Sequence, residues 1–74
     1  MAEFTEFLNE IHKLKYGVVA FNTYTHKEDE TILLFYLMVA KKGITGTFHK
    51  IEGNVGIMNY VLDKFLDKIK KEEA

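Results

Sequence analysis

A run of nine consecutive apolar residues, from Ile32 to Ala40, constrains the fold of this chain more than any other feature. The run is too short for a membrane-spanning helix, which needs about 20 apolar residues. Because charged residues and a glycine turn bound it, it is more typical of a buried strand than of a helix. Alternate side chains of a strand point to opposite faces, so this strand would be apolar on both. We therefore expect a central strand with the rest of the chain around it.

The composition indicates a small globular domain. The chain has 74 residues, of which 47% are apolar and 28% charged, and it contains no cysteine. A chain of this length is near the lower limit for folding without disulfides or metal. We predict a single domain over residues 1–74, in which residues 71–74 fray. Neither a signal peptide nor a membrane span is predicted, which favours a cytoplasmic protein without a membrane partner.

Two amphipathic helices are predicted, one on each side of the apolar run in sequence. In the first, apolar side chains recur at helical spacing from Phe4 to Leu14, and Gly17 would end the helix. In the second, they recur from Ile57 to Ile69, with Asn54 as the N-terminal cap. Each helix has one apolar stripe, and we expect both stripes to be buried against a sheet.

Two further strand patterns surround the central strand. Residues 18–25 are rich in β-branched and aromatic residues, and the charged loop His26–Glu30 would join them to the central strand as a hairpin. After a turn at Lys41–Gly43, residues 44–50 alternate in hydrophobicity, and Glu52–Asn54 would break this strand. The predicted fold class is therefore α+β, in the order α-β-β-β-α, with a three-stranded antiparallel meander and two helices packed on one face.

The alternation along the strands predicts a core on one face of the sheet and a candidate binding surface on the other. The expected core residues are Phe7, Ile11, Phe21, Phe35, Leu37, Phe48, Val61 and Phe65. The opposite face would be apolar along its middle strand, and exposed apolar patches with polar rims often mark interaction sites. The candidate partner-binding residues are Tyr24, Leu34, Tyr36, Met38, Thr47 and His49. In the alternative arrangement, the helices divide between the two faces and nothing is exposed.

No catalytic, cofactor or metal motif is present. Serine and cysteine are both absent, and the acidic residues form runs typical of solvated surfaces. The meander would place His26 and His49 at the same end of the sheet, on its outer strands and about 10 Å apart, which is too far for one metal ion. The segment Glu52–Gly56 matches no phosphate-binding fingerprint. We predict that the protein is not an enzyme and holds neither a cofactor nor a metal.

The element order resembles that of the double-stranded RNA-binding domain, and Leu8-Asn9-Glu10 is similar to the first-helix pattern of that family. The resemblance implies phosphate contacts from a basic cluster at the start of the second helix, where this chain has one lysine and one glutamate within Lys50–Gly56. The net charge is −1 and arginine, the residue best suited to bidentate phosphate contacts, is absent. Nucleic acid binding would have to use the lysines Lys41, Lys42, Lys64, Lys68 and Lys71.

The small size, the composition and the lone three-stranded sheet also resemble small phage-encoded inhibitors, including some anti-CRISPR proteins. That resemblance implies a protein target. Three functions are therefore carried forward: a non-enzymatic protein-binding module of the inhibitor type that uses the apolar sheet face, a homodimeric structural domain, and a nucleic acid binder of the double-stranded RNA-binding type. We expect the first.

Overall fold

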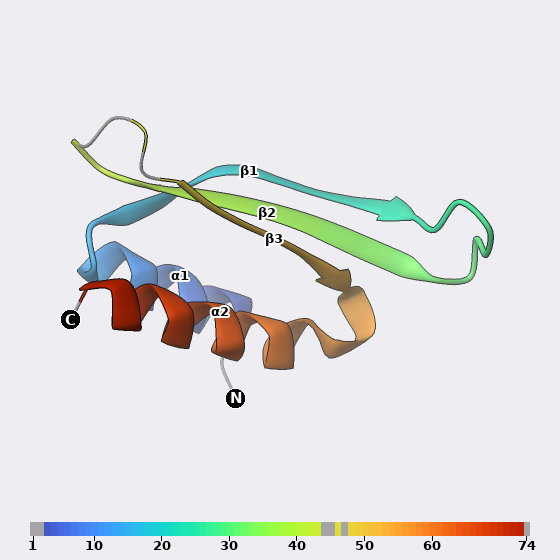
Figure 1. Ribbon diagram of the computed structural model, residues 1–74. Coiled ribbons are helices and arrows are strands. Elements are labelled where there is room, and N and C mark those ends of the chain that lie inside the picture. Colours follow the sequence, from blue (N-terminus) through green and yellow to red (C-terminus); the bar gives the residue numbers. More distant parts are fainter. Residues whose placement is uncertain (1–2, 44–45, 47, 74) are drawn as a thin grey trace.

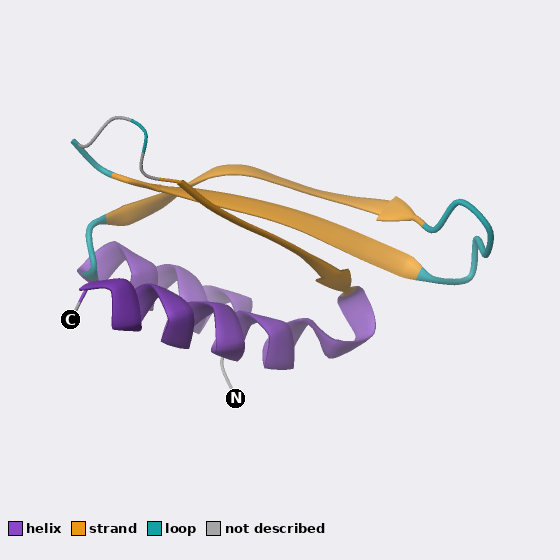
Figure 2. Ribbon diagram, viewed as in Figure 1, coloured by secondary structure: helices purple, strands orange, loops and turns teal. Residues whose placement is uncertain are grey.

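A computed structural model describes residues 3–43, 46 and 48–73. The elements are helix α1 (Phe4–Lys13), strands β1 (Tyr16–Thr25), β2 (Leu33–Lys41) and β3 (Phe48–Asn54), a short 3-10 helix η1 (Val55–Ile57) and helix α2 (Met58–Glu73). The strands form one antiparallel sheet in the order β1-β2-β3. Both helices lie on the same face of this sheet (Figure 1), as the colouring by secondary structure in Figure 2 also shows. The predicted α+β meander is confirmed, and the alternative with helices on both faces is wrong.

The core lies between β2 and the two helices. Phe35, Leu37 and Val39 alternate along β2, and each is completely buried. On the helix side of this row, Phe7 of α1 stacks on Phe65 of α2 with 5.9 Å between the ring centroids, so the two helices share one apolar layer. Of the predicted core residues, Val61 is only partly buried. The buried apolar residues are Phe7, Ile11, Tyr16, Phe35, Leu37, Val39, Leu62, Phe65, Leu66 and Ile69.

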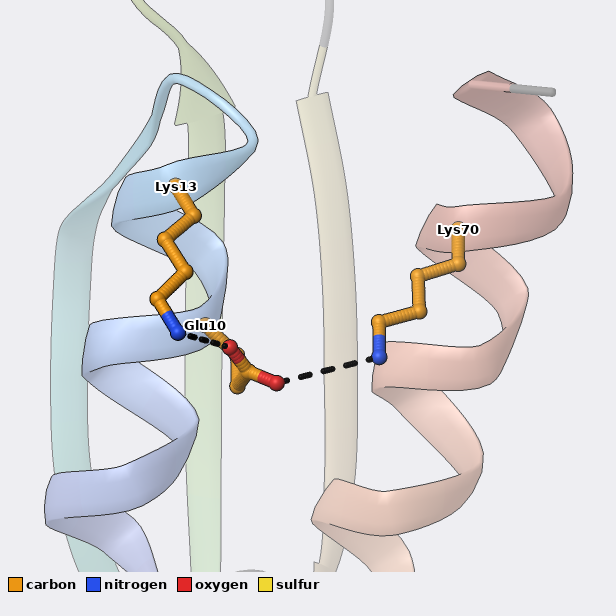
Figure 3. A network of polar contacts seen from close by, with 3 residues as sticks. All are labelled: Glu10, Lys13 and Lys70. Atoms are coloured by element: carbon orange, nitrogen blue, oxygen red, sulfur yellow. Dashed lines mark ion pairs between the residues drawn. The ribbon is translucent and has the colours of Figure 1, made fainter.

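The helices run in the same direction, α1 along β1 and α2 along β3 (Figure 1). The carboxylate of Glu10 lies between two lysines and links the helices at their surface (Figure 3). Its Oε2 is 3.1 Å from Lys13 Nζ, and its Oε1 is 3.9 Å from Lys70 Nζ. Solvent-exposed ion pairs of this kind contribute about 1 kcal/mol or less. Burial of the shared apolar layer, rather than ion pairing, therefore holds the helices on the sheet.

Strand β3 differs from the prediction because Gly53 belongs to the strand instead of breaking it. Gly53 pairs with Phe35 across the sheet. A Cβ at residue 53 would lie 3.1 Å from Phe35 Cε1 and 3.3 Å from Val61 Cγ2, so glycine allows these side chains to approach the backbone closely. Asn54 was predicted to cap the second helix and instead caps η1, which leads into α2: its Oδ1 accepts a hydrogen bond of 2.7 Å from the N–H of Gly56. Residues 44, 45 and 47 of the predicted strand lie outside the described residues.

The two faces of β3 are therefore the reverse of those predicted. His49 pairs with Val39 and so faces the helices, where its ring contacts Tyr16 and Phe65. Its Nε2 lies 3.0 Å from Glu72 Oε2 and 3.3 Å from the Tyr16 hydroxyl oxygen, so the partly buried imidazole has polar partners. Phe48 points to the opposite face and is 57% exposed, so its assignment to the core is wrong.

Smaller corrections concern the ends of elements. Helix α1 ends at Lys13 rather than near Gly17, because Lys15 adopts a left-handed φ of 69° and β1 begins at Tyr16. Phe21, predicted to be core, is 40% exposed although its ring lies 5.0 Å from that of Phe4. At the other end of the chain, residues 71–73 were expected to fray but continue α2.

The loop between β1 and β2 is organised around Asp29. The hydroxyl and the N–H of Thr31 donate hydrogen bonds of 2.6 and 3.0 Å to Asp29 Oδ1, and the N–H of Ile32 donates to the Asp29 carbonyl at 3.0 Å. The Thr31 hydroxyl first, and then its N–H, hold the pKa of the Asp29 carboxyl below its ordinary value. The loop is therefore structured by an ionised carboxylate.

Replacing Phe35 by Ala should lower the free energy of unfolding by about 3–5 kcal/mol, because it empties the centre of the core. Phe48→Ala is the matched control: it removes the same atoms from an exposed position of the neighbouring strand and should cost much less. Urea unfolding of both variants measures the difference. Equal losses for the two variants would contradict the assignment of faces.

The stabilising effect of the Asp29 carboxylate on its turn should depend on pH. A lowered pKa in the folded state means that the carboxylate stabilises the fold above the ordinary aspartate range, and that this contribution is lost as pH falls through the lowered value. In an NMR titration, the Thr31 amide should therefore shift with a midpoint below that of an unperturbed aspartate. Asp29→Asn keeps the accepting oxygen but not the charge, and should abolish the shift. A midpoint at or above the ordinary value would refute this expectation.

Candidate functional site

The candidate site is the open face, by which we mean the face of the sheet opposite the helices. Its central row consists of Leu34, Tyr36, Met38 and Ala40 of β2, all partly buried. These residues alternate with the buried row of the same strand, so they point away from the core. Over the described part of the chain, both helices lie on the other face (Figure 1). Among the described residues, the central row is therefore flanked by side chains of its own sheet and not covered by a helix.

Polar side chains of β3 border one side of the central row. Lys50 stands opposite Met38, Glu52 opposite Tyr36 and Asn54 opposite Leu34. At the end of this border, the exposed ring of Phe48 stands opposite Ala40 and extends the apolar surface onto β3. An apolar centre with a polar margin is the usual anatomy of a protein–protein interface.

On the other side of the central row, Tyr24 of β1 reaches across β2. Its hydroxyl donates a hydrogen bond of 3.0 Å to Glu52 Oε2 on β3. Because β1 and β3 are both neighbours of β2, the Tyr24 side chain spans the central strand on the open face. The hydrogen bond, with smaller effects of burial and of the Glu52 charge, raises the pKa of the Tyr24 phenol above its ordinary value. The phenol therefore stays protonated and donating at neutral pH.

The open face continues into a shallow hollow at the hairpin end of β1 and β2. Tyr24 and Leu34 belong to both, so the two surfaces are contiguous. The other lining residues come from the end of β1 and the loop, namely Thr25, His26, Lys27 and Glu28. This end of the face thus offers charges of both signs beside an aromatic ring.

Most of the predicted site residues come together on this face. Tyr24, Leu34, Tyr36 and Met38 do so, while Thr47 lies outside the described residues. His49 is on the opposite face, because its imidazole is held between Tyr16 and Glu72. Sequence reasoning missed Phe48, and the signal that could have found it is the alternation of Phe48, Lys50 and Glu52 along one side of β3.

Histidines and lysines were also considered as binding residues, and these residues lie on several different elements. His26 follows the hairpin end of β1, whereas His49 pairs near the opposite end of β2, so the expectation that they share one end of the sheet is wrong. Lys42 Nζ donates a hydrogen bond of 3.1 Å to His12 Nδ1, which attaches it to α1. Lys64 lies over the Tyr60 ring of α2, 5.5 Å from its centroid.

Among the described residues, no group of three or more His, Asp or Glu side chains is arranged to hold a metal ion. No helix in the described part of the chain is long and apolar enough to cross a membrane. Comparisons with protein-family models, with curated proteins and with solved structures found no match.

The hydrogen bond between Tyr24 and Glu52 should be detectable in solution through the pKa of Tyr24. Glu52→Ala removes the acceptor and the negative charge together, so the pKa of Tyr24 should fall toward its ordinary tyrosine value. NMR titration of the tyrosine ring carbons measures it, and Glu6→Ala is the control that removes an exposed carboxylate on α1, away from the open face. An unchanged pKa of Tyr24 in Glu52→Ala would mean that the two side chains do not interact in solution.

Proposed function

We propose that this protein acts by binding another protein through the open face. The observation that carries the proposal is the one-sided placement of the helices. They bury one apolar row of β2 and leave the other, Leu34, Tyr36 and Met38, on the solvent side. Full burial of a large apolar side chain contributes roughly 1.5–3 kcal/mol, so a partner seated on this row would gain stability from it.

The chemistry of the open face supports a protein partner. Tyrosine and methionine are enriched in interfaces, and tyrosines in particular contribute much of the binding energy. Tyr24 is held over β2 by its hydrogen bond to Glu52, so part of the surface is ordered before binding. Lys50 and Glu52 place opposite charges beside the apolar row and would orient the partner.

The kind of action that we propose is inhibition: this chain has no motif for chemistry of its own, and a bound target would be blocked by it. A cytoplasmic setting agrees with the absence of cysteine. Nucleic acid binding is less favoured, because the first turns after β3, Val55 to Tyr60, carry no basic residue. A second copy seated face to face is the other outcome that the experiment below distinguishes.

The test introduces two charges into the apolar row. Tyr36→Asp with Met38→Lys should weaken binding to a captured target more than tenfold, since the row would have to bury charge. Asn59→Asp with Tyr60→Lys is the matched control, because it places the same two charges on exposed positions of α2. Immobilised protein captures the target, and titration calorimetry measures the affinity of each variant.

The proposal fails if the folded Tyr36→Asp, Met38→Lys variant captures the same proteins with unchanged affinity. Loss of self-association without loss of any captured protein would instead make the open face a homodimer interface. Tight binding of duplex RNA with a steep salt dependence would favour the nucleic acid alternative.

A further inference from the structure

The two outer strands of the sheet differ in how they are protected. β1 is ten residues long and has no charged residue between Tyr16 and Thr25, whereas β3 is seven residues long and carries Lys50 and Glu52. Edge strands offer N–H and C=O groups as a template for another strand, and natural proteins block them with charge, proline, short length or a β-bulge. On β1 the only such device is the bulge between Val18 and Ala20. β1 is therefore the edge open to pairing.

The exposed apolar side chains are also concentrated at the β1 edge. The described chain has eight exposed large apolar residues, of which four lie on β1 and only Phe48 lies on β3. Val19, at the bulge, is 57% exposed. Phe21 is 40% exposed even though it packs against Phe4. The apolar surface of the molecule is thus concentrated along an edge that a strand could extend.

We propose that β1 pairs with β1 of a second copy, antiparallel, across a two-fold axis perpendicular to the sheet. A second copy fits this edge because antiparallel pairing of a strand with itself is self-complementary in its backbone groups. In addition, β1 has no charged residue, so pairing two copies of it brings no like charges together. Pairing two copies of β3 would place like charges close to each other near the axis. The small net charge of −1 leaves little long-range repulsion between copies.

The symmetry restricts the register. Residues that face the helices in one copy must stand opposite residues that face the helices in the other. Because side chains alternate along the strand, this condition is met only if the axis passes beside a residue, which then stands opposite the same residue of the second copy. The regular part of the strand after the bulge is 20–25. Its middle residues are Asn22, on the open face, and Thr23, on the helix side. The axis therefore passes at Asn22 or at Thr23.

This dimer extends beyond the proposed function, because it uses the edge rather than the open face. Since the axis is perpendicular to the sheet, all helices of the dimer lie on one side. The two open faces then join into one surface of twice the width. Tyr24, which is on β1, would lie near the middle of that joint surface.

Sedimentation equilibrium tests the dimer. The wild type should sediment with twice the mass of the 8.6 kDa chain. Val19→Lys with Thr23→Lys should sediment as the single chain, because lysines on the edge oppose strand pairing. Tyr36→Asp with Met38→Lys should stay dimeric, which separates this proposal from the previous one. A monomeric wild type, an assembly larger than a dimer, or a folded edge variant that remains dimeric would overturn it.

Cysteine cross-linking tests the register and does not depend on the lysine variants. The chain has no cysteine, so Asn22→Cys and Thr23→Cys each introduce a single thiol. Opposite Cβ atoms in an antiparallel pair are about 4.5–5.5 Å apart, close enough for a disulfide after small adjustments. One of the two variants should form a covalent dimer under mild oxidation, while Lys50→Cys on β3 should stay a single chain. Failure of both variants, or equal cross-linking of Lys50→Cys, would overturn the proposal.

Discussion

Burial of Phe35, Leu37 and Val39 beneath two helices is the constraint on which the rest of this structure depends. Hydrophobicity alone does not explain why this row is the buried one, because Leu34, Tyr36 and Met38 on the other side of β2 are nearly as apolar. Two differences between the rows explain it: how the side chains pack against β3, and whether they carry a polar group. The ring of Phe35 packs against the bare backbone of Gly53, whereas Tyr36 in that place would bury a hydroxyl at a cost of about 1–3 kcal/mol without a partner.

This choice determines what the molecule presents to solvent. With Phe35 and its row turned toward the helices, Tyr36 and its row form the middle of the open face. In the observed register, Lys50 and Glu52 of β3 stand opposite Met38 and Tyr36 and therefore point outward as well. Lys50 and Glu52 consequently serve both as the margin of the open face and as the charges that protect the β3 edge.

The sequence was sufficient for the elements whose pattern is long and regular. The apolar run predicted β2, and helical spacing predicted α1 and α2, because each pattern extends over many residues. The face of β3 was not predicted, because Gly53 was interpreted as a strand breaker and His49 as a polar, outward residue. Both belong to the core side for tertiary reasons: the ring of Phe35 needs the space at Gly53, and His49 has a hydrogen-bonding partner in Tyr16, 33 residues away in sequence. Only the regular outward placement of Lys50 and Glu52 could have indicated this from sequence.

Helix α2 supplies four of the ten buried apolar residues of the described chain, Leu62, Phe65, Leu66 and Ile69. Because α2 follows the sheet in sequence, it also leaves the ribosome after the sheet. Until then only α1 can cover the helix side of the sheet, and the core is incomplete. Such partly covered sheets are the species most prone to aggregate and to engage chaperones. Docking of α2 is thus the step that completes the core, and until it occurs the buried row of β2 is only partly covered.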